Sequence, residues 1–82
     1  MELKRQIICF SLETEELIFC QNIDQIALAN LKDIFHPEED DPFMYYVYGI
    51  GVTEARMLNE EWGIEIEFDF QKFSYELHCS TT

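Results

Sequence analysis

Residues 64 to 79, which read IEIEFDFQKFSYELHC, alternate apolar and polar side chains almost without error. Successive side chains of a β-strand point to opposite faces of its sheet, so this alternation predicts two half-buried strands joined by a turn. The residues expected to point inward are Ile64, Ile66, Phe68 and Phe70 on the first strand and Phe73, Tyr75, Leu77 and Cys79 on the second. The C-terminal part of the chain therefore predicts a β-hairpin.

The N-terminal part predicts another hairpin. Residues 5 to 12 (RQIICFSL) and 17 to 22 (LIFCQN) are rich in β-branched and aromatic residues, and the polar loop ETEE separates them. A register symmetric about this loop pairs Phe10 with Phe19 and Cys9 with Cys20. The face expected to point into the core carries Ile8, Phe10, Leu12, Leu17 and Phe19. Cys9 and Cys20 could then form a disulfide under oxidation, although we expect reduced thiols.

Two helices are predicted between the hairpins. Apolar residues recur at three- and four-residue steps in residues 24 to 35, behind Asn22 or Asp24 as a cap, and Pro37 ends this helix. The second helix is expected to begin at Thr53 and to stop at a left-handed Gly63. Its inward residues are Ala55, Leu58 and Trp62.

The predicted order of elements is ββ-α-α-ββ. It corresponds to a four-stranded antiparallel sheet with two helices packed on one face, which belongs to the α+β class. The 82 residues are expected to form a single acidic domain, residues 1 to 82, because a second core would not fit in this length. Hydrophobic residues make up 48% of the chain, which is enough for it to fold despite its charge.

Charge restricts the partners that this chain can bind. Seventeen Asp and Glu residues against five Lys and Arg residues give a formal net charge of −12. Such a charge repels nucleic acid and anionic lipid, so we expect a basic protein partner. The N-terminus lacks the features of a secretory signal and the apolar stretches are too short to span a membrane, which predicts a cytoplasmic protein.

Two acidic surfaces are candidate partner-binding sites. The first combines the acids between Pro37 and Pro42 with the aromatic residues that follow, which offer contact area and cation–π platforms; its candidates are Glu38, Glu39, Asp40, Asp41, Tyr45 and Tyr46. The second is the polar face of the C-terminal hairpin, where the symmetric register opposes like charges that a cation would relieve; its candidates are Glu65, Glu67, Asp69 and Glu76. In that register Glu67 faces Glu76 and Glu65 faces His78. Each acid taken alone is more often a solvated residue, but together they suggest one continuous negative surface.

Residues for catalysis or metal binding do not assemble in the sequence. His36 and His78 have no Ser or Cys nucleophile near them along the chain, and the glycines of residues 49 to 51 lack a basic neighbour for a phosphate. The acids of residues 38 to 41 lack the alternating ligands and glycine of a calcium loop, and the cysteines lack the CxxC pairs of a zinc site. We therefore expect no enzymatic activity, no metal and no cofactor, with the carboxylates of Glu65 and Glu67 as the weaker enzymatic alternative.

Four segments carry a resemblance to known proteins: FSLETEELI at residues 10 to 18, EDDPFM at 39 to 44, the TEA that opens at Thr53, and EFDFQKFSYEL at 67 to 77. They resemble small acidic bacterial proteins, and the chain as a whole is similar to immunity proteins encoded beside secreted toxins in contact-dependent inhibition and polymorphic toxin systems. The resemblance implies a small cytoplasmic protein that neutralises a toxin domain, frequently a basic nuclease, by covering its active site or its nucleic-acid surface. It implies no binding residue at a particular position.

The hypothesis from the sequence is thus a non-catalytic immunity protein that occludes a basic toxin. The alternatives are a nucleic-acid mimic that inhibits a DNA-binding protein and a generic adaptor or self-assembling domain. A mimic should space its acids regularly over an elongated surface, whereas acids clustered beside aromatic anchors favour an inhibitor of one protein. A monomer and a weak homodimer are both compatible with the sequence.

Overall fold

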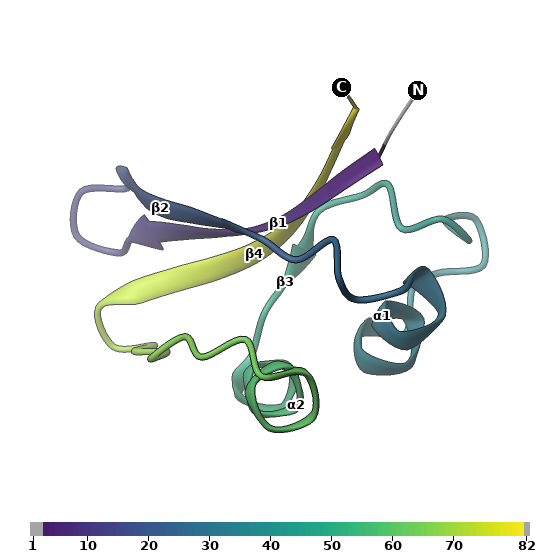
Figure 1. Ribbon diagram of the computed structural model, residues 1–82. Helices are drawn as coiled ribbons and strands as arrows, with labels where there is room; N and C mark the ends of the chain where they lie inside the picture. Colours follow the sequence, from purple (N-terminus) through teal and green to yellow (C-terminus); the bar gives the residue numbers. More distant parts are fainter. Residues whose placement is uncertain (1–2, 82) are drawn as a thin grey trace.

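Four strands form one antiparallel sheet in the computed structural model, which describes residues 3–81. In chain order the elements are β1 (Leu3–Ser11), β2 (Leu17–Asn22), α1 (Leu28–Phe35), β3 (Tyr48–Gly49), α2 (Val52–Trp62) and β4 (Phe73–Thr81). The strands lie in the order β2-β1-β4-β3, and Figure 1 shows both helices on the same side of the sheet. The predicted fold class, an α+β fold with a four-stranded antiparallel sheet and two helices, is confirmed.

The C-terminal strand pairs differently from the prediction. β4 lies beside β1, with Ile7 opposite Leu77, and on its other side it pairs with the short β3. Residues 64 to 70, predicted as a strand, form no strand pairing within the described residues. The predicted pairs of Glu67 with Glu76 and of Glu65 with His78 are therefore wrong, because Glu76 lies opposite Ile8 and Gly49 and His78 lies opposite Gln6.

The alternation of residues 64 to 70 has another cause. Ile64 and Ile66 are buried while Glu65 and Glu67 are exposed, so the segment does turn alternate side chains toward the core. Glu65 has a left-handed backbone (φ 61°), however, which a regular strand does not accommodate. The Asn59 side chain also forms hydrogen bonds with both main-chain polar groups of Ile66: it donates to the carbonyl at 2.8 Å and accepts the N–H at 3.1 Å. The main chain of Ile66 is thus bonded to a side chain of α2 and not to a neighbouring strand.

The first hairpin forms as predicted, but with its register shifted. Phe10 pairs with Leu17, Cys9 with Phe19 and Ile8 with Cys20, with an irregularity between Cys9 and Phe10. The turn closes at Ser11, whose carbonyl accepts the Glu15 N–H at 2.8 Å and whose hydroxyl accepts the N–H groups of Glu13 and Thr14, both at 3.2 Å.

This shift exchanges the two faces of β1 but not those of β2, because a slip of one residue turns the side chains of one strand over relative to the other. Phe19 of β2 packs against the core, as predicted. Ile7 and Cys9 are fully buried, whereas Ile8 and Phe10 are half-buried on the face without helices. The prediction that Cys9 and Cys20 face each other is wrong. Cys9 lies in the core and Cys20 is exposed.

Both helices differ slightly from their predicted starts. α1 begins at Leu28 because Asn22 and Asp24 are used at the end of β2, where the Asn22 side chain accepts the Asp24 N–H and the Asp24 carboxylate accepts the Arg5 N–H. α2 begins after Gly51, whose N–H donates to the Glu54 carboxylate at 2.8 Å. Its predicted end is confirmed, since Gly63 follows α2 in the left-handed conformation with φ 62°.

The core lies between the sheet and the two helices. Its fully buried large side chains come from strands, helices and loops alike: Ile7, Ile23, Leu31, Met44, Leu58 and Leu77. Tyr75 of β4 is surrounded by the rings of Phe19, Phe68, Phe70 and Phe73, and its hydroxyl accepts the Asp69 N–H at 2.9 Å. In the described part of the chain, no helix has the length and apolar character needed to cross a membrane.

Candidate partner-binding site

Residues 36 to 47, which connect α1 to β3, form a loop that we call the aromatic loop (Figure 1, right). Asp41 organises it. This side chain is 2% exposed, and its carboxylate accepts the N–H of Tyr45 at 2.8 Å, the N–H of Tyr46 at 3.1 Å and the hydroxyl of Tyr48. Three donors thus converge on one buried carboxylate, and they fix the chain that follows it.

The ionisation states of this cluster follow from its contacts. Burial alone would raise the pKa of Asp41, but the hydrogen bonds from Tyr48, Tyr45 and Tyr46 outweigh it and hold the pKa below its ordinary value of 3.8. Burial and the bond to Asp41 raise the pKa of Tyr48 from 10.0 to about 12. At neutral pH the cluster therefore contains an ionised carboxylate and a neutral phenol.

Two further contacts hold the aromatic loop in place. Met44 has a left-handed backbone (φ 55°), a conformation that costs a side-chain-bearing residue about 1 kcal/mol. Its side chain is 1% exposed, so burial of the thioether in the core offsets that strain. The Arg5 guanidinium reaches across from β1 and donates to the Phe43 carbonyl at 2.6 Å.

This anchoring leaves four large side chains exposed together. Phe43, Tyr45, Tyr46 and Val47 are 52–54% exposed, and we call them the aromatic platform. The Phe43 and Tyr45 rings stack with their centroids 5.7 Å apart and their planes at 28°. Because the buried Met44 lies between these two, the loop turns one residue into the core and its neighbours out to solvent.

Acidic side chains border the aromatic platform. Glu38, Glu39 and Asp40 are all exposed and precede it in the loop. The Tyr46 hydroxyl donates to the Asp40 carboxylate at 3.4 Å, and the negative charge of Asp40 raises the pKa of Tyr46. The arrangement combines aromatic faces with carboxylates, which is suited to binding the side chains of Arg and Lys.

The first predicted surface is thus largely brought together by the fold. Glu38, Glu39, Asp40, Tyr45 and Tyr46 are exposed and lie in one loop. The exception is Asp41, which is buried and occupied by internal hydrogen bonds, so its prediction as a surface contact is wrong. The prediction also omitted Phe43 and Val47, although the aromatic run in which they lie was visible in the sequence.

The second predicted surface is not brought together. Glu65 and Glu67 are exposed on the segment that follows α2. Asp69 is half-buried and forms a turn, since its carboxylate accepts the Gln71 N–H at 3.1 Å. Glu76 lies on β4 between two buried residues, so it points to the face without helices, where it contacts His78 at 2.9 Å.

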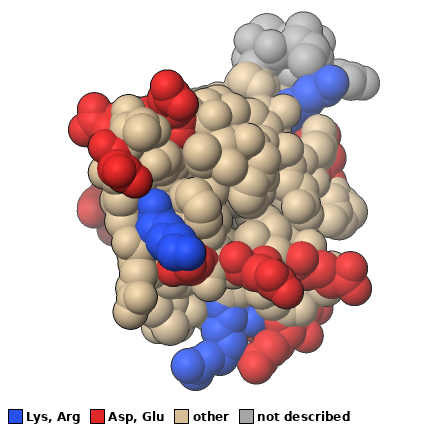
Figure 2. Space-filling view, turned by 90° about the vertical axis from the view of Figure 1, so that its left-hand side faces the viewer, with Lys and Arg blue, Asp and Glu red and all other residues tan. Residues whose placement is uncertain are grey.

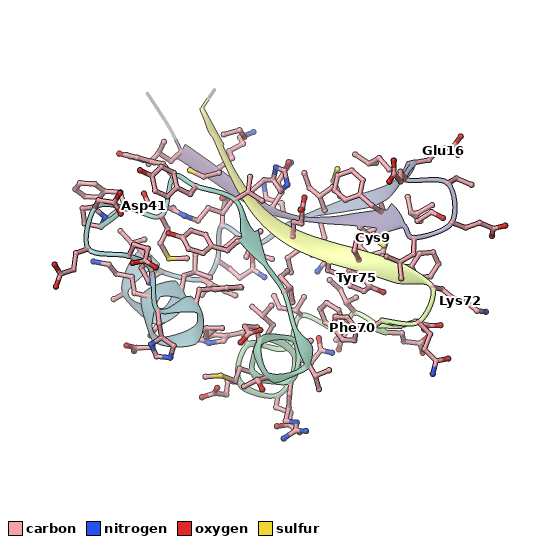
Figure 3. The ribbon with its side chains drawn as sticks, turned by 180° about the vertical axis from the view of Figure 1, so that it is seen from behind. Cys9, Glu16, Asp41, Phe70, Lys72 and Tyr75 are labelled. Carbon is pink, nitrogen blue, oxygen red and sulfur yellow. The ribbon has the colours of Figure 1, made fainter. Side chains whose placement is uncertain are left out.

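The acids therefore do not form one continuous negative surface. Figure 3 shows Asp41 at the left end of the molecule and Phe70, which follows the segment of Glu65 and Glu67, below the sheet on the other side of α2. Figure 2 views the molecule from the tip of the first hairpin and shows acidic side chains in separate groups, with basic side chains between them. The aromatic loop is a distinct acidic surface.

Elsewhere on the described surface, the hollows are weaker candidates for a functional site. A cleft of about 440 Å³ lies at the β3–β4 edge and is lined by Leu12, Phe70, residues 49 to 51 and residues 73 to 76, with Glu76 as its acidic side chain. Over residues 3–81, no group of three or more His, Cys, Asp and Glu side chains is arranged to hold a metal ion.

The fold and the aromatic loop define a small acidic α+β protein with an anchored, solvent-exposed aromatic surface. Residues 4–78 match the family described as "Domain of unknown function (DUF7683)", and because the match covers most of the chain, the protein belongs to this family. No curated protein and no solved structure matches the chain. The family description names no activity, so function has to be argued from the surface itself.

Proposed function

We propose that this protein is a non-catalytic, cytoplasmic immunity protein that neutralises a cognate basic toxin, for example a nuclease, by covering its active site or substrate surface. The observation that carries the proposal is the aromatic platform, which is exposed to solvent, anchored by Asp41 and bordered by Glu38, Glu39 and Asp40.

Rigid aromatic side chains are suited to anchoring a protein interface. They bury a large area at a small cost in conformational entropy, and Tyr is among the residues enriched in interface hot spots. Here the cost is reduced further, because Asp41 already fixes the main chain of Tyr45 and Tyr46 before any partner binds. The platform therefore has the character of a preorganised anchor.

The charge supports a basic partner. A nuclease presents a positive cleft to the phosphates of its substrate, and a protein of net charge −12 is steered toward such a cleft. The exposed Glu38, Glu39 and Asp40 would then occupy positions of substrate phosphates. A nucleic-acid mimic is favoured less, because the principal dimensions of 33 × 27 × 22 Å do not describe an elongated body with a regular row of charges.

The first experiment is to find the partner. Tagged protein is incubated with lysate of its source cells and with the product of the neighbouring upstream gene, at low and at high salt, and retained proteins are identified by mass spectrometry. The proposal expects a basic toxin domain at a ratio near one to one, whose toxicity in cells is removed by co-expression of this protein. Retention of a DNA-binding regulator instead would favour the mimic, and retention of the protein alone would favour self-assembly.

The second experiment tests the surface. The double variant Tyr45→Ala, Tyr46→Ala should weaken binding of the toxin domain by at least about 30-fold, the loss expected for a hot spot. Trp62→Ala removes an aromatic side chain that is 36% exposed on α2 and serves as the matched control, with affinity unchanged. Wild-type affinity of a folded double variant would exclude the aromatic platform as the binding site.

A further inference from the structure

The outer edge of β2 carries main-chain groups without partners. β2 is the first strand of the order β2-β1-β4-β3, so on its far side it pairs with no strand of residues 3–81. The Ile23 N–H donates to the Arg5 carbonyl of β1 at 3.0 Å. Along an antiparallel strand, the main-chain groups of every second residue point to the same neighbouring strand, so those of Phe19 and Gln21 also bond to β1. The N–H and C=O of Cys20 and Asn22 therefore point to the free edge, where no hydrogen bond within residues 3–81 reaches them.

This edge lacks the features that usually protect an edge strand. The sequence LIFCQN contains no Lys, no Pro and no charge, and Leu17 and Ile18 are 54% and 47% exposed. The irregularity in the β1–β2 pairing lies between Cys9 and Phe10, at the start of β2, and leaves the stretch from Phe19 to Asn22 regular. The opposite edge of the sheet is different, because β3 is a strand of two residues.

Acidic side chains surround the β2 edge. Glu16 precedes β2 and Asp24 follows it, and both are exposed. The Gln21 side chain donates to the Ile64 carbonyl at 3.2 Å, which brings the segment with the exposed Glu65 alongside β2. An added strand would therefore meet the carboxylates of Glu16 at one end and of Glu65 along one side, while the Asp24 carboxylate at the other end accepts the Arg5 N–H of β1.

These observations select the kind of strand that fits. We propose that the free edge of β2 binds an extended segment of a basic protein, with Lys or Arg among its side chains, which adds to the sheet as a further strand. A second copy of this chain fits less well: centred on Cys20, antiparallel pairing would place Glu16 opposite Asp24 of the other copy, and each copy carries a net charge of −12. The inference does not rest on the aromatic platform, because Figure 3 places Glu16 and Asp41 at opposite ends of the molecule.

The test uses a short synthetic peptide in which Lys and Arg alternate with Val, and a matched peptide with Glu in place of the basic residues. Amide hydrogen exchange of the whole protein is followed by NMR. The basic peptide should slow exchange at Cys20 and Asn22 by at least about tenfold and leave Phe19 and Gln21, which already bond to β1, unchanged. The acidic peptide should have no effect.

Two substitutions at one position separate strand addition from side-chain contact. Cys20→Pro removes an N–H that points away from β1, so the β1–β2 ladder should persist while the effect of the peptide is lost. Cys20→Ala keeps the N–H and should respond as the wild type does. If Cys20→Pro fails to fold, the variant Glu16→Lys, Glu65→Lys is used instead and should lose most of the response to the basic peptide.

Three outcomes would overturn the inference. Equal protection by both peptides would show that charge does not select the strand. Protection of Cys20 and Asn22 without peptide, rising with protein concentration, would assign the edge to a second copy of the chain. Changes confined to residues 43 to 47 would leave the aromatic platform as the site and remove β2, so failure here is distinguishable from failure of the proposed function.

Discussion

Replacing Tyr48 by phenylalanine tests whether the aromatic loop is held by its buried carboxylate. The substitution removes the hydroxyl that donates to Asp41 and keeps the ring, which packs against Phe35 at a centroid distance of 6.1 Å. Apolar packing is therefore preserved, and Asp41 keeps the two N–H bonds from Tyr45 and Tyr46.

The size of the effect can be worked out in two ways. A hydrogen bond to a charged group contributes about 1.5 to 3 kcal/mol. Burial and the bond to Asp41 raise the pKa of Tyr48 from 10.0 to about 12, and such a change corresponds to about 2.7 kcal/mol. Burial is the larger of the two causes, and Tyr48 is partly exposed to solvent, so the bond accounts for less than this total. We expect Tyr48→Phe to lower the free energy of unfolding by about 1 to 2 kcal/mol at neutral pH.

The pH dependence of this difference has a defined sign. The pKa of Tyr48 is raised by burial and by Asp41, so its stabilising contribution is complete below its ordinary value of 10.0 and is lost as the pH rises through about 12. The pKa of Asp41 is lowered by its hydrogen bonds despite its burial, so its contribution is complete above 3.8 and is lost as the pH falls through the folded value. The difference between wild type and variant should be largest between these limits and shrink on both sides.

Urea unfolding of both proteins at acidic, neutral and alkaline pH measures this difference. Tyr46→Phe is the matched control, because its hydroxyl is exposed and lies 3.4 Å from the solvated Asp40, so its removal should change stability little. The reasoning is refuted by equal losses in the two variants, or by a loss in Tyr48→Phe that does not change with pH.

Two further predictions concern the backbone and the thiols. Gly63→Ala should lower the free energy of unfolding by about 1 to 2 kcal/mol, because Gly63 has a left-handed backbone with φ +62°. Gly49→Ala, in strand β3, should leave the free energy of unfolding unchanged. At both positions a Cβ would meet no described heavy atom within 4 Å, so the two variants differ only in backbone conformation. Thermal unfolding of the two variants measures this contrast, and an equal loss in both would rule out the backbone as its cause. The exposed Cys20 should react quickly with a thiol reagent, while Cys9, which is fully buried and whose pKa burial raises, should react upon unfolding. Mass spectrometry of labelled peptides follows both thiols, and rapid labelling of Cys9 in the folded protein would contradict its burial.

The fold class could be predicted because its signals are local. Alternation and β-branched residues indicated the strands, and apolar spacing with Gly63 indicated the helices and one helix end. Residues 64 to 70 were wrongly predicted as a strand, because an extended segment packed on a helix alternates buried and exposed side chains in the same way as a strand does. The left-handed backbone of Glu65 interrupts a regular strand, and the Asn59 side chain of α2 bonds to the main chain of Ile66. Neither feature can be recognised from a local sequence pattern.

The candidate site could be predicted to the level of the loop but not to the level of each acid. Two prolines and an aromatic run identified residues 36 to 47 as a surface, and Tyr45 and Tyr46 are exposed there. The sequence does not separate Asp41 from Asp40, because both are acids beside aromatic residues. The separation is geometric: Asp41 lies within reach of three donors and is buried, while Asp40 remains in solvent.

The difference between the buried Asp41 and the exposed acids of the aromatic loop affects which partner can bind. Arg5, the base that bonds to the aromatic loop, donates to the Phe43 carbonyl and adds to the positive potential at Asp41. The three outer carboxylates, Glu38, Glu39 and Asp40, are instead exposed to solvent, where charged groups are hydrated. An uncharged partner that covered the aromatic platform would strip that water without replacing its hydrogen bonds, and each buried, unpaired carboxylate would oppose the gain from the aromatic contacts. A partner with Arg or Lys facing those carboxylates replaces the water, so the platform supplies affinity while the acids select for a basic surface.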